Sequence, residues 1–260
     1  MDKEINIIDK IKLQKSIKGE LIIDCHAHYG LTYPMYVPYW SEKQFIDYVN
    51  LIGIEYICIS HFLSVGPDFK AGNDEVFRLM KRYPHKIIGQ AVINPNYPSE
   101  VRIELERCFN NGFRIFKLHP MFHEYRADGK NYKPVYEFCD DNKLIILSHS
   151  FESPDFLEKM AKKYKNIIYI IGHGNDKGYE EVLKNFKNVF MSIVCSNEFG
   201  EIERLVREVG SDKLLFGTDT PYLDAGFQLG SIIYADISDM DKRKILGKNM
   251  FKILKGIKLI

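Results

Sequence analysis

Eight short apolar runs recur along the chain and constrain its fold more than any other feature. They are rich in Ile, Val, Leu and Phe and cover residues 21–28, 54–62, 86–94, 113–119, 143–149, 166–173, 188–196 and 213–219. Continuous apolar runs of this length, rather than alternating ones, are typical of strands that are buried on both faces of a parallel sheet. The sequence therefore predicts eight parallel strands.

Segments with helix start signals lie between these runs. Ser41 and Gln44 form a capping-box pattern, and Ser153 places a cap before Pro154. Eight strand–helix units in a chain of 260 residues predict an α/β fold, a single-domain TIM-type (β/α)8 barrel. A doubly wound open sheet is the alternative. It would need a glycine-rich phosphate turn after the first strand, where the chain reads DCHAHYG.

We assign residues 20–260 to the barrel and residues 1–19 to an N-terminal extension, whose Ile and Leu spacing predicts a short helix at the barrel bottom. The formal net charge of +1 gives no electrostatic signature of a nucleic-acid or membrane partner. The five cysteines form no CxxC pair, and the sequence shows neither a membrane-spanning apolar run nor a signal-peptide core. We therefore expect a cytoplasmic protein.

Histidines gather at one end of the predicted strands. Six of the eight lie in the last positions of an apolar run or directly after it, namely residues 26, 28, 61, 119, 149 and 173. His123 lies in the loop just beyond the fourth run, and only His85 stands at a strand entrance. The C-terminal ends of the strands form the face where barrel enzymes place their chemistry. The clustering therefore predicts an active site at this face.

Part of this cluster has the pattern of a metal site. His26 and His28 are two residues apart on one strand, so their side chains share a face and can reach one ion. His149 ends the fifth run, His173 the sixth and Asp219 the eighth. Imidazoles with a carboxylate supply the nitrogen and oxygen donors that a divalent ion such as zinc prefers. Taken alone, Asp219 could instead cap a helix.

The order of these motifs resembles the amidohydrolase superfamily. The chain reads D-x-H-x-H in the first run, KLHP in the fourth, GHGN in the sixth and GTDTP in the eighth. It is most similar to the amidohydrolase-related branch, which contains hydrolases, lactonases and decarboxylases of the aminocarboxymuconate-semialdehyde type. The resemblance spans residues 20–255. It implies a barrel, a divalent metal and a small-molecule substrate, and it leaves a homodimer open.

The resemblance also implies roles for individual residues. His26, His28, His149 and Asp219 would bind a single metal ion, with zinc expected first and manganese, cobalt or iron as alternatives. Asp219 and His173 would be catalytic. Asp219 would take a proton from metal-activated water, and His173 would polarise a carbonyl or stabilise the developing oxyanion.

Lys117 and His119 both point inward from the fourth strand in the predicted barrel. Lys117 is interpreted first as a charged lysine that anchors a substrate anion or pairs with a nearby carboxylate. The alternative is a carbamylated lysine that bridges two metal ions, the second held by His149 and His173. His119 is a candidate substrate contact or a buried, hydrogen-bonded histidine.

Two loops supply further candidates for substrate binding. Residues 29–40 form an unusually aromatic stretch that includes Tyr33 and Trp40, which predicts a wall or lid over the site or packing against the barrel helices. In the loop 121–132, Arg126 is the candidate clamp for a substrate carboxylate. Its alternative is a solvated surface arginine.

Two enzyme functions compete. We expect a metal-dependent hydrolase that acts on an amide, ester or lactone of a small, acidic molecule. The alternative is a metal-dependent nonoxidative decarboxylase of a small unsaturated or aromatic carboxylic acid. A non-catalytic metal-binding barrel is a third interpretation, disfavoured because each expected ligand is present. TatD-like nucleases also open with HxH, but KLHP replaces the glutamate they carry on the fourth strand.

Overall fold

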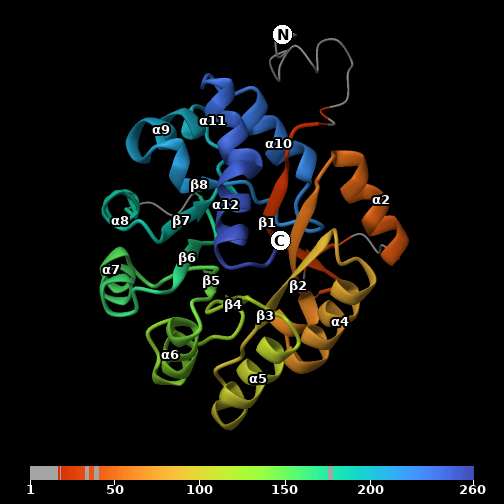
Figure 1. The fold of residues 1–260 in the computed structure, drawn as a ribbon, viewed down its shortest axis with the longest axis vertical. Coiled ribbons are helices and arrows are strands. Elements are labelled where there is room, and N and C mark those ends of the chain that lie inside the picture. The colour runs from red at the N-terminus through yellow and green to blue at the C-terminus, as the bar shows by residue number, and fades with distance from the viewer. Residues whose placement is uncertain (1–16, 18, 33–34, 38–40, 175–177) are drawn as a thin grey trace.

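The computed structural model is a TIM-type (β/α)8 barrel, which confirms the predicted fold class (Figure 1). It describes residues 17, 19–32, 35–37, 41–174 and 178–260. Within these residues, eight parallel strands follow one another in sequence order around one sheet. The strands are β1 (Ile23–Tyr29), β2 (Tyr56–His61), β3 (Ile87–Val92), β4 (Ile115–Leu118), β5 (Ile145–Ser148), β6 (Ile168–Ile171), β7 (Val189–Ser192) and β8 (Leu214–Leu215).

Backbone hydrogen bonds close the barrel between β1 and the segment that follows β8. The Cys25 N–H donates to the Phe216 carbonyl at 2.9 Å, and the His28 N–H donates to the Thr220 carbonyl at 2.7 Å. In the other direction, the Asp219 N–H donates to the His26 carbonyl at 2.8 Å. The turn that carries Asp219 is therefore attached directly to the strand that carries both first-strand histidines.

Helices surround the strands, and the predicted start signals are confirmed. They are α2 (Glu42–Ile52), α3 (Phe62–Val65), α4 (Phe69–Arg82), α5 (Pro98–Asn110), α6 (Lys133–Asp141), α7 (Pro154–Lys163), α8 (Glu180–Asn185), α9 (Glu201–Val209), α10 (Ala225–Ile233), α11 (Asp239–Arg243) and α12 (Asn249–Gly256). Ser41 and Gln44 form the reciprocal capping box of α2, and the Ser153 hydroxyl caps α7. None of the helices among the described residues is long and apolar enough to cross a membrane.

The C-terminal helix closes the base of the barrel. Met250, Ile253 and Leu254 of α12 belong to one buried cluster with apolar side chains that come from strands around the barrel, Ile23, Cys58, Ile88, Ile115, Leu147, Ile170 and Leu215. Figure 1 shows α12 lying across the strands. The helix predicted for residues 1–19 falls almost entirely outside the described residues.

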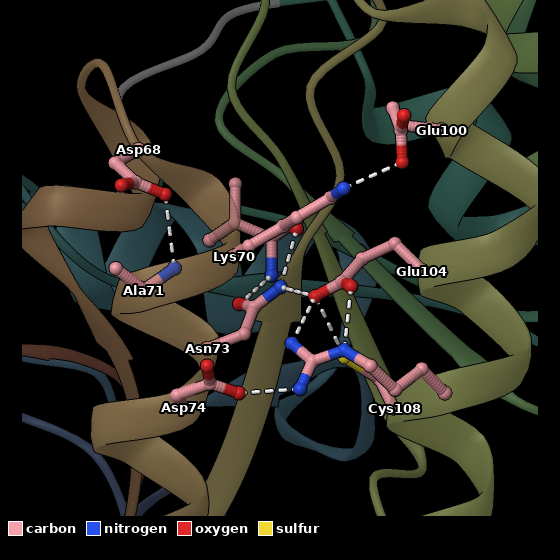
Figure 2. A network of polar contacts seen from close by, with 10 residues as sticks. Asp68, Lys70, Ala71, Asn73, Asp74, Glu100, Glu104 and Cys108 are labelled. Carbon is pink, nitrogen blue, oxygen red and sulfur yellow. Dashed lines mark hydrogen bonds and ion pairs between the residues drawn. The ribbon is translucent and has the colours of Figure 1, made fainter.

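A buried polar network ties β3 to the helices outside it (Figure 2). The Asn73 side chain on α4 accepts from the Val92 N–H at 2.8 Å and donates to the Val92 carbonyl at 2.9 Å. It also donates to Glu104 on α5 at 2.7 Å, and Arg107 pairs with the same carboxylate. Because Glu104 is buried, its charge requires these partners. The network therefore holds α4, α5 and the end of β3 together.

Candidate metal centre

His26, His28 and Asp219 converge at the C-terminal mouth of the barrel. Their ligand atoms all lie within 4.8 Å of one another, and all three residues are buried. Asp219 Oδ1 is 3.1 Å from His28 Nε2 and 3.6 Å from His26 Nε2. Two atoms bound to one ion at about 2.0–2.2 Å lie roughly 2.8–3.6 Å apart in tetrahedral or octahedral sites. The observed separations therefore fit a single divalent ion.

The hydrogen bonds of His26 also suit a metal ligand. Its Nδ1 lies 2.8 Å from the carbonyl oxygen of Gly172, which can only accept, so Nδ1 carries the ring proton. The lone pair is thereby left on Nε2, the nitrogen that faces His28 and Asp219. A backbone carbonyl that sets the tautomer in this way is the usual support for a metal-binding histidine.

Lys117 lies against Nε2 of His26. Its Nζ is 2.6 Å from His26 Nε2, and the side chain is fully buried. Burial lowers the pKa of Lys117 to about 7, although the charge of Asp219 opposes this shift. An ion bound to His26 therefore requires Lys117 to release the His26 lone pair. The lysine can then turn its donors towards another anion at the mouth.

Asp219 is held in a strained but well-bonded turn. Its φ angle of 60° lies in the left-handed region, which aspartate enters more readily than most residues. Burial by itself would raise the pKa of Asp219. The hydrogen bond from His28 and the electrostatic interaction with the His28, His26 and His173 imidazoles outweigh burial and hold that pKa well below its usual range. Asp219 therefore remains ionised and can act as a ligand or a proton acceptor.

Two residues that the sequence reasoning missed orient His28. Ser60 Oγ on β2 lies 3.0 Å from His28 Nδ1, and the Phe62 ring stacks on the imidazole at a centroid distance of 4.5 Å. With its proton on Nε2, His28 donates to Asp219; with its proton on Nδ1, it donates to Ser60 and leaves Nε2 free for a metal. Ser60 pairs with His28 in the β1–β2 ladder, so strand register was the signal that could have found it.

Asp24 supports the site from below. Its carboxylate accepts the His26 N–H at 3.0 Å and the Thr218 hydroxyl at 2.5 Å, so it joins β1 to the turn that carries Asp219. Burial raises the pKa of Asp24 to about 7, although the hydrogen bonds from Thr218 and His26 lower it. The DxHxH pattern thus contains a positioning carboxylate as well as two candidate ligands.

The other predicted histidines form a stack beside this group. His173 Nε2 is 2.9 Å from His149 Nδ1, and the His149 ring stacks on His119 at 4.3 Å between centroids. Phe122 covers the opposite face of His119 at 4.6 Å. Within the described residues, the three-ligand group does not include His149. Its predicted role as the fourth ligand, like the catalytic role of His173, stays a prediction.

Burial controls the charge of this stack. Burial, together with the charge of Lys117, lowers the pKa of His173 to about 4 and that of His149 to about 3, although the charge of Asp219 opposes both shifts. Burial also lowers the pKa of His119. The imidazoles are therefore neutral near pH 7, and a single proton lies between His149 and His173.

Two glycines at strand ends lie in crowded surroundings. A Cβ on Gly172 would lie 2.6 Å from the Ser148 carbonyl oxygen and 3.2 Å from His26 Cε1. A Cβ on Gly217 would clash with Ser192 Oγ and lie 3.1 Å from His26 Cβ. Neighbouring strands and His26 therefore fill the space beside both glycines, and a side chain at either position would not fit.

The candidate loop residues lie apart from the cluster or outside the described residues. The Arg126 side chain is 69% exposed and pairs with Asp128 at 2.9 Å and with Glu152 at 3.4 Å. These carboxylates, rather than the histidines, are its partners. Tyr33 and Trp40 lie outside the described residues, so their predicted part in a lid stays a prediction.

Comparisons with known proteins agree with the motif pattern. Residues 23–255 match the family described as Amidohydrolase. No curated protein sequence matches the chain.

Several solved structures share the fold at low identity. A dihydroxybenzoic acid decarboxylase from Polaromonas sp. JS666, with bound manganese and the inhibitor 2-nitroresorcinol, has a TM-score of 0.75 at 15% identity over 91% of this chain and 97% of that one. A 2,6-dihydroxybenzoate decarboxylase from Rhizobium has a TM-score of 0.72 at 14% identity, over 92% and 99%. A putative amidohydrolase from Staphylococcus aureus has a TM-score of 0.69 at 15% identity, over 91% and 99%. At these identities, the likeness is one of fold.

Proposed function

The chain belongs to the amidohydrolase family, and we propose that it is a metal-dependent enzyme that decarboxylates a small aromatic or unsaturated carboxylic acid without oxidation. The observation that carries this proposal is the fully buried Lys117 beside the three converging ligands His26, His28 and Asp219. Two of the similar structures are decarboxylases of dihydroxybenzoic acids, which supports the same choice of reaction.

The charges at the mouth favour an anionic substrate. The imidazoles of His149 and His173 are neutral near pH 7 because burial lowers their pKa. The Lys117 ammonium and the Asp219 carboxylate balance each other, so a bound divalent ion leaves the site positive. An acid with one carboxylate offsets part of that positive charge, and burial strengthens the attraction because the local dielectric is low.

The neighbouring side chains supply the remaining functions. Once it releases His26, Lys117 can bind the substrate carboxylate. The ring of Phe122, which stacks on His119 and is partly exposed, offers a flat surface for an aromatic or unsaturated body. Decarboxylation leaves an electron pair on carbon that must be protonated. We infer that the His149–His173 pair, which shares one proton between two nitrogens, passes a proton to that carbon and regains one from water.

We propose that His26, His28, His149 and Asp219 hold the ion. When bound, a divalent ion supplies Lewis-acid stabilisation of negative charge on substrate oxygens. Zinc and manganese are the first candidates, since a similar structure contains manganese. A second ion with a carbamylated Lys117 is the alternative. Elemental analysis of the purified protein separates one equivalent from two.

The proposal is tested by product analysis. The zinc- or manganese-loaded protein is incubated with hydroxylated benzoates and unsaturated acids in D2O, and CO2 release is measured. We expect CO2 together with one deuterium at the carbon that carried the carboxylate. The variant His173→Asn should lose turnover but keep its metal. Loss of the metal from this variant would instead favour the two-ion site.

Hydrolysis is the second candidate. Asp219 remains ionised beside His28, as a base that accepts a proton from water must be, and the matched family is described as Amidohydrolase. A panel of lactones and N-acyl acids in 18O-labelled water tests this candidate. Label in the product, with no CO2 from the acid panel, would overturn the decarboxylase proposal and establish the hydrolase.

A further inference from the structure

We propose that the base of the barrel holds a second site, which binds a small organic carboxylate with an apolar body. A cavity of about 480 Å³ lies there between α12 and the loops that enter β5, β6 and β7. This volume falls within the range of roughly 300–1,000 Å³ that small-molecule sites occupy. The proposal goes beyond the proposed function and does not depend on it, because the cavity is at the end opposite the metal centre.

The floor of the cavity is apolar. Ile168 at the start of β6 and Phe190 in β7 line it on the strand side. Ile253 and Ile257, from α12 and the residue that follows it, line the helix side. All four belong to or pack against the cluster that fills the barrel interior, so their positions are set by the core. A hydrocarbon chain or ring placed here would cover apolar surface that water otherwise meets.

The rim of the cavity is cationic. Lys143 precedes β5, Lys187 precedes β7 and Lys252 lies on α12, so three separate segments contribute one ammonium each. Among the described residues, none of these lysines is in an ion pair. Lysines elsewhere on the surface have carboxylate neighbours, for example Lys43 with Asp47 and Lys162 with Glu158.

The other polar groups of the lining do not neutralise this charge. Asp212 is engaged by Lys244, which lies outside the lining, at 2.9 Å. The Asn249 amide donates to the carbonyls of Ser211 and Leu214 at 2.7 and 2.9 Å, and the Asn188 amide donates to the Ile167 carbonyl at 2.8 Å. These amides hold the strand entry loops in place. The lysines therefore remain available for an external anion.

An apolar floor under a cationic rim selects one ligand chemistry. A carboxylate head suits the three ammonium groups, and an aliphatic or aromatic body suits the floor. The rim lysines would repel a cation, and a small hydrophilic anion would leave the apolar floor exposed to water. A ligand bound here connects α12 to the entry loops of three strands, so it should stabilise the folded chain by mass action.

The test uses octanoate as the probe and the metal-loaded full chain. We expect saturable binding by calorimetry and a rise in melting temperature, with much weaker effects from acetate or octan-1-ol at equal concentration. The double variant Lys187→Glu/Lys252→Glu should weaken octanoate binding about tenfold or more, since it reverses two rim charges. The matched control is Lys165→Glu, an exposed lysine in the same region that does not line the cavity.

Octanoate could also reach the metal centre, and the variants separate the two sites. Binding that is lost in the double variant but kept in Lys165→Glu places octanoate at the base. Equal binding by the wild type and the double variant, or no saturable binding of octanoate by the wild type, overturns the proposal. A Phe190→Ala variant tests the floor, because it should weaken octanoate without changing the response to acetate.

Discussion

The mouth and the base of this barrel both contain buried side chains, but those at the mouth are polar or ionisable and those at the base are apolar. At the mouth, His26, His28, Lys117 and Asp24 are removed from water together with Asp219. At the base, α12 covers apolar strand residues with Met250, Ile253 and Leu254. Burying charge and imidazole costs stability unless every group has a partner, whereas burying aliphatic side chains contributes stability. The stability contributed by burying apolar side chains at the base therefore offsets the stability lost by burying polar groups at the mouth.

This contrast also explains where pKa values are displaced. Burial lowers the pKa of Lys117 and of the mouth histidines and raises that of Asp24. Strongly displaced pKa values of this kind mark functional sites when they gather in one place. The comparison leads to a simple expectation. Changes at the mouth should affect metal binding and turnover, and changes within the apolar base should affect folding.

The largest expected effect follows from removing the candidate carboxylate ligand. Asp219→Asn keeps the shape of the side chain but weakens its binding to a cation, so we expect metal loss and a fall in turnover of about 1,000-fold. Metal content and turnover are measured on the same preparation. Asp47→Asn, on an exposed helix face, is the control. A metal-replete and active Asp219→Asn protein would contradict the proposed centre.

The next effect concerns the base. Leu254→Ala removes a fully buried side chain of α12 and should lower the free energy of unfolding by about 2–5 kcal/mol. Urea denaturation measures this loss, with the exposed Lys255→Ala on the same helix as a control. Metal stoichiometry of the folded variant should stay unchanged. If Leu254→Ala lost metal without losing stability, the expectation that the mouth governs metal binding and the base governs folding would be wrong.

A smaller effect is expected from the support of His28. Ser60→Ala removes the oxygen that faces His28 Nδ1 and should weaken metal affinity by about 10–100-fold with little change in stability. Competition with a metal chelator measures the affinity. Ser64→Ala, which removes a hydroxyl bonded to the His61 carbonyl instead, serves as the comparison. Equal affinities for both variants would show that Ser60 does not orient the ligand.

The smallest effect is expected at the edge of the mouth. Arg126 is exposed and already paired with Asp128, so Arg126→Ala should change KM by no more than about twofold, as expected for an exposed ion pair. Steady-state kinetics with the substrate found in the product screen measures KM. An increase of tenfold or more would restore Arg126 as the clamp that the sequence suggested.

Much of the fold could be predicted from the sequence because burial on both faces leaves a local signature. Each of the eight apolar runs coincides with an observed strand, although β1 ends one residue beyond its run, and the caps at Ser41 and Ser153 begin the helices they were expected to begin. The end of the last run was predicted less well. The run 213–219 contains only the two-residue β8, and the chain from Phe216 onward turns while its backbone bonds to β1.

The candidate site was predictable in part. His26, His28 and Asp219 were found because strand ends meet at one face of a barrel, and that rule needs no atomic detail. The partners of these residues were not found. The contact of Lys117 with His26, the bond of Ser60 to His28 and the link of Thr218 to Asp24 join segments up to 194 residues apart in the sequence.

The sequence by itself determined the barrel, the face that carries the chemistry and the types of donor atoms, because periodicity and residue chemistry are local properties of the chain. Only the tertiary structure decided which donors converge. It brought His26, His28 and Asp219 together, paired Arg126 with Asp128, and brought Lys117 to the nitrogen that a metal would use. These outcomes depend on strand register, barrel closure and side-chain packing. Such features arise only when distant segments fold against one another.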